Sequence, residues 1–286
     1  RHPAQALERT REALEGLGEV VRAGLDAAPA TPLNVDIGPH RRLVFVRGDV
    51  EDFKLVKNAF GGTVNDVLLT VVAGALQTWL RSRGVRTEGL ELRALVPVSI
   101  RTRTERHQLG NRIAAMRAPL PVYVQDPVAR LRVVAQATQG LKDSKQALGA
   151  EVLASLEALA PPTMLAQASR INFSTRLFNL LVTNVPGPQF PLYVLGRELQ
   201  DLFPVAFLPK RHALAVAIMS YNGRMDFGLL GDYDAMPDLD ALGEMVRANL
   251  AELVAAARAP GNGSGDVSSR GRTSRPRTSS PATTGV

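Results

Sequence analysis

The chain has 286 residues, of which 45% are hydrophobic and none is cysteine, and its formal net charge is +7. This composition excludes disorder along the whole chain and allows a large core, in one big domain or two modest ones. The lack of cysteine excludes a disulfide framework, a thiolate nucleophile and a cysteine-ligated metal.

The first residues, HPAQALERTREALEGLGEVVRAGL, predict a helix that is already under way at residue 1. Neither a translation start nor a signal-peptide pattern is visible, so we interpret the chain as the later part of a longer polypeptide. The next stretch, DAAPATPLNVDIGPHRR, contains three prolines and little periodicity, which is typical of a linker or a crossing segment.

Three elements are predicted between residues 41 and 83. RRLVFVRG is typical of a strand, and DVEDFKLVKNAF predicts a short helix with Phe53, Val56 and Phe60 on one face. The run GGTVNDVLLTVVAGAL then opens a long buried helix over residues 64 to 83. Thr63 and Asp66 fit a capping box, which predicts that Asp66 holds the helix start and contributes about 1 kcal/mol of stability.

Asn65 does not have such a local explanation. The residues that share its helix face are all apolar, namely Leu68, Leu69, Val72 and Leu76. A buried amide without partners costs about 1 to 3 kcal/mol. We therefore expect the Asn65 amide either to be fully hydrogen-bonded inside the core or to face a cleft where a ligand binds.

The second half alternates strands and helices. ELRALVPVSIR and RIAAMRAPLPV predict strands, and Asp126 with Pro127 predicts the start of a helix that runs along Leu131, Val134, Thr138 and Leu141. Further helical segments are expected from the 150s to about residue 179. LFNLLVTNVPGP predicts a strand closed by a type II turn at Pro186-Gly187. Asn222-Gly223 predicts a hairpin, and a final helix follows from Leu239.

Several catalytic classes lack their motifs: the sequence has no GxSxG elbow, no GxGxxG after a strand, no P-loop and no HExxH. The four histidines, His2, His40, His107 and His212, have neither a neighbouring histidine nor a metal-ligand spacing, so packing or surface roles are favoured for them. His40 beside Arg41 and Arg42 could instead meet a phosphate-bearing ligand. Thr183 and Asn184, at the end of an apolar strand, are candidate ligand contacts.

The positive charge alone selects no partner. Four arginines in the final 25 residues supply much of it, and a moderate surplus suits anionic ligands and solubility equally. Five per cent aromatic residues and no basic helix argue against nucleic acid. No apolar run reaches the roughly 18 residues of a membrane span, so any contact with a membrane or lipid droplet is expected to be peripheral and the location cytoplasmic.

Taken in order, PLNVDIGPHRR, GGTVNDVLLTVVAGAL, LRALVPVSIR, LGN, TNVPGP and YNGRMDFGLLGDYDAMPD resemble the C-terminal half of the bacterial wax ester synthase/diacylglycerol acyltransferase family. The resemblance divides the chain into residues 1–29, a helix and linker from a missing N-terminal lobe; residues 30–258, the C-terminal domain; and residues 259–286, a disordered tail. It implies an α/β fold of the chloramphenicol acetyltransferase type, that is, a CoA-dependent acyltransferase lobe with a mixed sheet flanked by helices.

The resemblance also implies a reaction. Family members transfer an acyl group from acyl-CoA, a substrate rather than a cofactor, to diacylglycerol or a long-chain alcohol, giving triacylglycerol or wax ester. Their general base is the second histidine of an HHxxxDG motif in the N-terminal lobe, which this sequence lacks. This chain alone is therefore expected to be inactive. Asn65 and Asp66 match the Asn-Asp motif of the family, which makes Asn65 a candidate donor facing the tunnel between the lobes and Asp66 its support.

Two other functions remain open at this stage. One is a non-catalytic lobe that binds acyl chains or partners in a degenerate relative. The other is condensation chemistry for peptides or polyketides on the same fold, which neighbouring carrier-protein domains would favour. An upstream HHxxxDG would favour the acyltransferase.

Overall fold

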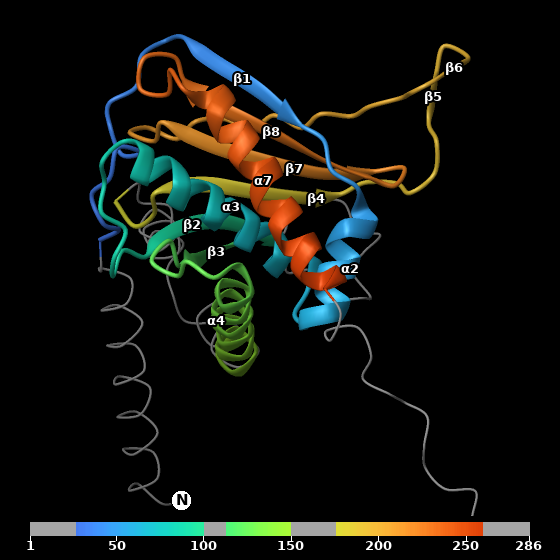
Figure 1. Ribbon diagram of the computed structural model, residues 1–286. Helices are drawn as coiled ribbons and strands as arrows, with labels where there is room; N and C mark the ends of the chain where they lie inside the picture. Colours follow the sequence, from blue (N-terminus) through green and yellow to red (C-terminus); the bar gives the residue numbers. More distant parts are fainter. Residues whose placement is uncertain (1–26, 100–112, 150–175, 260–286) are drawn as a thin grey trace, which may run out of the picture.

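The computed structural model describes residues 27–99, 113–149 and 176–259 (Figure 1). The strands of the main sheet are β1 (Arg41–Val46), β2 (Leu92–Ser99), β3 (Ile113–Leu120), β4 (Leu180–Pro186), β7 (Leu214–Tyr221) and β8 (Arg224–Asp232). The helices are α2 (Val50–Phe60), α3 (Val64–Ser82), α4 (Pro127–Gly149) and α7 (Leu239–Arg258). A small hairpin of β5 (Tyr193–Val194) and β6 (Arg197–Glu198) completes the described elements.

The sheet has six strands in the order β1-β8-β7-β4-β2-β3. The β1–β8, β7–β8 and β2–β3 pairs are antiparallel, while β4 runs parallel to β2 and to β7. The four helices cover one face of this sheet (Figure 1). The expected mixed sheet flanked by helices is therefore confirmed. The other face, which we call the helix-free face, is covered only by loop segments among the described residues.

The strands and helices predicted within the described ranges are present, except that the helical prediction up to about residue 179 is wrong for residues 176–179, which form a turn before β4. The β5–β6 hairpin was not predicted, because two-residue strands leave no periodic pattern in the sequence. The predicted N-terminal helix, the LGN stretch at 109–111, the helical segments from 150 to 175 and the tail beyond residue 259 lie outside the described residues.

Helix α3 is the centre of the core. Apart from the exposed Thr78, its residues from Asp66 to Leu80 are buried, because the helix packs against the sheet and against α2, α4 and α7. This burial on all sides explains why the run is apolar around its circumference rather than along one stripe. None of the described helices is by itself long and apolar enough to cross a membrane; α2 and α3 pass that test only as a pair bent by 99°.

A buried arginine joins the three helices α3, α4 and α7. Arg130 of α4 is 2% exposed, and its guanidinium donates to Gln77 Oε1 of α3 at 2.6 Å and to Asn249 Oδ1 of α7 at 3.4 Å. It also donates to the backbone carbonyl of Val124 at 3.0 Å. Burial lowers the pKa of Arg130, but these acceptors replace the water that the guanidinium loses.

The predicted hairpin at Asn222-Gly223 is confirmed. Both residues have positive φ, 43° and 82°, as the type I′ turn between two antiparallel strands requires. Met225, Phe227 and Leu229 alternate along β8 and pack into the core beneath the helices. Local turn chemistry and period-2 patterning thus agree with the tertiary structure at this hairpin.

The predicted type II turn at Pro186-Gly187 is wrong. Pro186 is the last residue of β4, still paired with Ser220 of β7, and Gly187 lacks the positive φ that a type II turn needs at its second centre. Glycine is required there for space, since a Cβ atom on Gly187 would lie 2.2 Å from the Ser220 carbonyl oxygen. Pro186 therefore ends the strand, and Gly187 follows it without a type II turn.

Candidate functional site

The start of α3 is fixed by the predicted capping box. The Asp66 backbone N–H donates to Thr63 Oγ1 at 3.3 Å, and Asp66 Oδ2 accepts from the Thr63 backbone N–H at 2.8 Å. The Thr63 hydroxyl also donates to Asp66 Oδ2 at 2.8 Å. Two backbone donors that a helix start leaves unpaired are thereby satisfied.

Asp66 does more than cap its own helix. Its second oxygen, Oδ1, accepts from the Thr138 hydroxyl of α4 at 2.6 Å, and the carboxylate is only 2% exposed. The preceding Gly62 has a φ of 80°, and a Cβ there would lie 3.3 Å from both Asp66 and Ala135 of α4. Asp66 is thus the junction between the start of α3 and the side of α4, which the sequence pattern did not reveal.

Asn65 is half-buried in the first turn of α3, beside this junction. Its side-chain amide forms no hydrogen bond with any residue in the described ranges. Leu68, Leu69, Val72 and Leu76, which share its face, are buried in the core. The amide is therefore neither exposed like a surface asparagine nor hydrogen-bonded within the described part of the core.

Thr183 and Asn184 lie near the end of β4, where the chain becomes half-buried. Side chains two positions apart share a face of a strand, so Asn184 lies on the same face as Leu180 and Val182 of the main core and faces the helices. Thr183 lies with Leu181 on the helix-free face. β4 ends at the same end of the molecule at which α3 begins (Figure 1). Asn184 and Asn65 thus lie at the same end of the molecule and on the helix-covered face of the sheet.

His40 and Arg41 lie at the opposite end of the sheet. Arg41 pairs with Asp232 in the β1–β8 register, seven strand positions from Met225, which is aligned through Ser220 with Pro186 at the end of β4. Its guanidinium donates to the carbonyls of Gly38 at 2.6 Å and His40 at 2.8 Å and contacts Asp232 Oδ2 at 3.4 Å. The predicted site residues therefore form two separate groups, and Arg41 is engaged by the protein itself.

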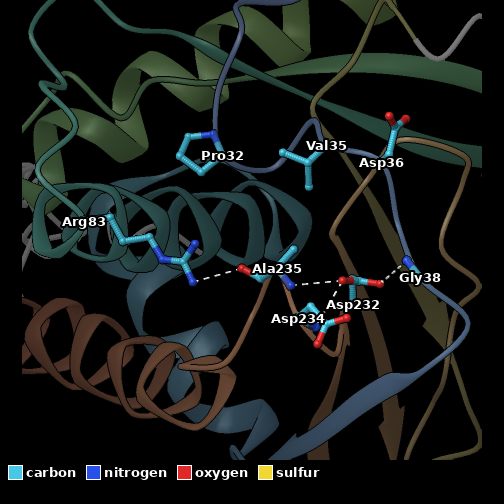
Figure 2. Close-up of a pocket in the computed structure, with 8 residues that line it drawn as sticks. All are labelled: Pro32, Val35, Asp36, Gly38, Arg83, Asp232, Asp234 and Ala235. Carbon is cyan, nitrogen blue, oxygen red and sulfur yellow. Dashed lines mark hydrogen bonds between the residues drawn. The ribbon is translucent and has the colours of Figure 1, made fainter.

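A pocket of about 480 Å³ occupies this opposite end (Figure 2). Its lining comes from the linker before β1, the end of α3 and the turn after β8, and consists of Pro32, Val35, Asp36, Gly38, Arg83, Asp232, Asp234 and Ala235. Carboxylates outnumber cations on these walls. A pocket of this charge does not suit the phosphate-bearing ligand considered for the neighbouring basic residues.

Asp232 organises the floor of this pocket. Burial alone would raise its pKa, but hydrogen bonds from the backbone N–H groups of Ala235, Gly38 and Asp234, together with Arg41, outweigh burial and lower it. The carboxylate is therefore ionised at neutral pH and joins the turn after β8 to the linker before β1. This link joins PLNVDIGPHRR to GDYDAMPD, two stretches far apart in the chain, so neither stretch predicts it.

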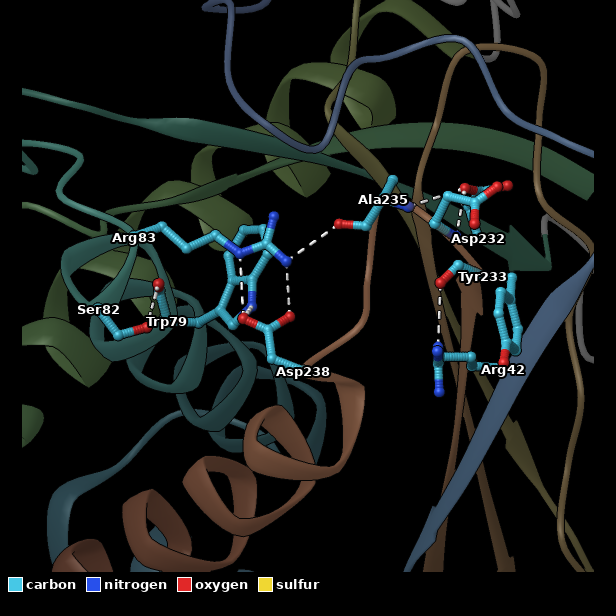
Figure 3. Close-up of polar contacts among 9 residues, drawn as sticks. Arg42, Trp79, Ser82, Arg83, Asp232, Tyr233, Ala235 and Asp238 are labelled. Atoms are coloured by element: carbon cyan, nitrogen blue, oxygen red, sulfur yellow. Dashed lines mark hydrogen bonds and ion pairs between the residues drawn. The ribbon is translucent and has the colours of Figure 1, made fainter.

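The single arginine of the pocket is also held by the protein (Figure 3). Arg83 forms a bidentate ion pair with Asp238, in which Nη2 donates to Oδ1 at 2.6 Å and Nε donates to Oδ2 at 3.0 Å. Its guanidinium carbon lies 4.3 Å from the ring centroid of Trp79. The Trp79 indole N–H donates to the same carboxylate at 3.0 Å. These contacts join the end of α3 to the start of α7. Among the described residues no cluster of His, Asp and Glu is arranged to hold a metal.

Exposed apolar side chains concentrate beyond β4. We call residues 189–199, which include the β5–β6 hairpin, the arm; in Figure 1 it extends away from the sheet. Leu195 at its tip is 99% exposed and Tyr193 is 64% exposed. Other exposed apolar residues in and around the arm are Val185, Phe190, Val194, Val205 and Phe207. Such a concentration is typical of a surface that a partner covers.

Family models match two parts of the chain. The WS/DGAT C-terminal domain matches residues 109–254, and the wax ester synthase/diacylglycerol acyltransferase catalytic domain matches residues 3–68, which contain Asn65 and Asp66. A Mycobacterium tuberculosis protein named as a diacylglycerol O-acyltransferase is 33% identical over 257 residues, covering 88% of this chain and 51% of the relative. Another from that organism is 31% identical, covering 89% and 57%.

Solved structures agree with these matches. The wax ester synthase/diacylglycerol acyltransferase from Marinobacter aquaeolei superposes with a TM-score of 0.65 at 29% identity, covering 80% of this chain and 52% of that one. The epimerization domain of a tyrocidine synthetase gives a TM-score of 0.55 at 15% identity, which shows a shared fold alone. The chain spans about half the length of the relatives it matches.

Proposed function

Because this chain belongs to the wax ester synthase/diacylglycerol acyltransferase family, we propose that it supplies one lobe of an enzyme that transfers an acyl group from acyl-CoA to diacylglycerol or a long-chain alcohol. The observation that carries this proposal is the Asn65 amide, half-buried and without a partner among the described residues, within the stretch matched by the catalytic-domain model. A second lobe, with the base, completes the site.

The proposed chemistry needs few groups. The acceptor hydroxyl attacks the thioester carbonyl carbon, a base takes the hydroxyl proton, and negative charge develops on the carbonyl oxygen. When the tetrahedral species collapses, the C–S bond breaks, the ester is released, and the CoA sulfur leaves with the proton. A histidine of the second lobe, as in the HHxxxDG motif of the family, would be the base, and Asn65 would donate to the oxygen.

The position of Asn65 supports this role. The first backbone N–H groups of α3 have no acceptor within the helix, so the helix start already favours negative charge. Asp66 fixes the first turn through Thr63 and Thr138, so the neighbouring amide is held by a rigid element rather than by a loop. The arm and the loop after it offer the apolar surface on which a second lobe would dock.

The proposal is tested with an acyl-CoA assay on the chain fused to the upstream lobe, with diacylglycerol and a long-chain alcohol as acceptors. Asn65→Ala in that protein is expected to lower kcat about a hundredfold or more, as the loss of an oxyanion donor does. Asn58→Ala, an exposed asparagine on α2, is the matched control and should leave kcat unchanged. Unchanged turnover in a folded Asn65→Ala protein would reject the role of Asn65.

The same assay tests the function itself. Ester formation by the fused protein, but not by this chain alone, supports an enzyme completed by two lobes. A fused protein that binds acyl-CoA yet forms no ester with either acceptor would instead indicate a non-catalytic acyl-binding lobe.

A further inference from the structure

One buried carboxyl on the helix-free face has no role in the proposed chemistry. The neighbours of Asp226 in β8, Met225 and Phe227, point into the main core beneath the helices. Because successive side chains of a strand point to opposite faces, the Asp226 side chain faces away from the helices. It is 0% exposed, and neither carboxyl oxygen has a hydrogen-bond partner in the described part of the chain. An ionised carboxylate in that position is strongly disfavoured.

A loop covers this carboxyl. We call residues 199–208 the strap. Its first carbonyl, that of Leu199, accepts from the Tyr221 hydroxyl at 2.9 Å. Phe203 stacks on Phe45 of β1 with ring centroids 4.5 Å apart. The Pro204 carbonyl lies so close to β8 that a Cβ on Gly228 would be 1.8 Å from it. The strap therefore packs directly on the strand that carries Asp226.

The Arg47 guanidinium binds the strap, and Arg47 itself is the register neighbour of Asp226. Arg47 pairs with Asp201 of the strap at 2.7 and 3.3 Å and lies 4.9 Å from the Phe203 ring centroid. The backbone bonds that follow β1 pair Gly48 with Met225, so Arg47 stands opposite Asp226 and on the same face of the sheet. Two carboxyl groups, Asp201 and Asp226, thus compete for Arg47.

We propose that the strap is a cover whose opening is controlled by the proton on Asp226. With the proton bound, the neutral acid stays buried and Arg47 remains with Asp201, so the strap is closed. When the proton is lost, the strap lifts, water reaches the carboxylate and Arg47 turns to it. Opening uncovers the helix-free face at Phe45 and Gly228.

The charges around Asp226 give the direction of the effect. Burial first, and then Asp201 and Asp49, raise its pKa, whereas Arg47 and Arg224 lower it, and the balance lies at about 6. An open strap would return the group towards its ordinary value of 3.8. The closed state binds the proton more tightly, so closure is favoured at low pH and is lost as the pH rises from about 4 to about 6. By this linkage the equilibrium constant for opening increases about tenfold between pH 5 and pH 7.

The absence of native cysteine allows a direct test with a single reporter thiol. Ala217 is 2% exposed, shares the helix-free face with Ala215 and pairs with Gly228, against which the Pro204 carbonyl of the strap packs. In an Ala217→Cys protein, reaction with a disulfide-exchange reagent requires strap opening. Leu195→Cys, at a site 99% exposed, gives the reference rate at each pH, so that the ratio of the two rates removes the titration of the thiol itself.

The expected ratio rises about tenfold from pH 5 to pH 7 and then levels off. Asp226→Asn, which cannot ionise, should give a low ratio that does not change with pH. Asp201→Asn should raise the ratio at every pH, because Arg47 no longer holds the strap. Asp36→Asn, a substitution at an exposed carboxylate, is the control and should behave as the parent does.

A ratio independent of pH in the parent, or an undiminished pH dependence in Asp226→Asn, would overturn the inference. If Ala217→Cys does not fold, hydrogen exchange of the strap amides in the unsubstituted chain, corrected for the intrinsic exchange rate, measures the same opening. No acyl transfer enters these measurements, so they succeed or fail independently of the proposed function.

Discussion

At the scale of single residues, two neighbours in one helical turn have opposite environments. Asp66 is buried and fully bonded, to Thr63 within its own helix start and to Thr138 across to α4. Asn65, one position earlier, is half-buried and has no partner among the described residues. The capping role of Asp66 followed from the Thr-x-x-Asp spacing, while its bond to α4 depends on how two helices meet and has no local signature.

Asp66 should therefore contribute more stability than a cap alone. Asp66→Ala is expected to lower the free energy of unfolding by about 3 kcal/mol, because the cap is lost and Thr138 is left with one buried partner fewer. Thr63→Ala, which removes only the cap hydroxyl, should cost about 1 kcal/mol. Chemical denaturation of the three proteins measures both values, and equal losses would show that the bond to α4 contributes nothing.

At the scale of elements, the packing of α3 against α4 and α7 depends on one glycine. A Cβ on Gly74 would lie 2.0 Å from Asn249 Oδ1 and 2.3 Å from the Arg130 guanidinium. The interior of α3 would otherwise favour alanine over glycine. Glycine is thus present because the buried network of Arg130, Gln77 and Asn249 occupies the space beside the helix backbone.

Two glycine-to-alanine changes separate this packing effect from helix propensity. Gly74→Ala is expected to destabilise the protein by about 2 kcal/mol or more, since the Arg130 network must move and lose hydrogen bonds. Gly140→Ala, on the exposed side of α4 with nothing within 4 Å of the new Cβ, should instead stabilise by up to about 1 kcal/mol. Thermal unfolding compares the two directly, and a stabilised Gly74→Ala would contradict this account.

At the scale of the whole molecule, helices cover one face of the sheet, and among the described residues only loop segments cover the other. The helix-free face carries the strap, and the arm extends beyond the end of β4 with a tip that is almost fully exposed. Both features suit the proposal that a second lobe completes the protein, consistent with a chain that spans about half the length of its relatives.

The arm gives this proposal a test that does not depend on catalysis. When this chain is produced together with the separate upstream lobe, Leu195→Asp is expected to weaken their association about tenfold or more, because a charge would enter an apolar contact. Tyr123→Ser changes an exposed aromatic residue between β3 and α4 and should not affect it. Co-purification and calorimetry measure the association; equal affinity of both variants would exclude the arm from the interface.

The sequence by itself determined most of the described strands and helices, the capping box at the start of α3 and the Asn222-Gly223 hairpin. These features depend on residues that are near one another in the chain, so their spacing and conformational preferences can be recognised in the sequence. It also singled out Asn65 as an amide that its own helix face does not explain.

Only the tertiary structure decided which distant groups meet. It separated His40 and Arg41 from Asn65 by the length of the sheet, paired Pro186 with Ser220 at the end of β4, and buried Asp226 beneath the strap. Each of these outcomes is set by contacts between segments far apart in the sequence, where burial and packing, rather than local preference, fix the free energy.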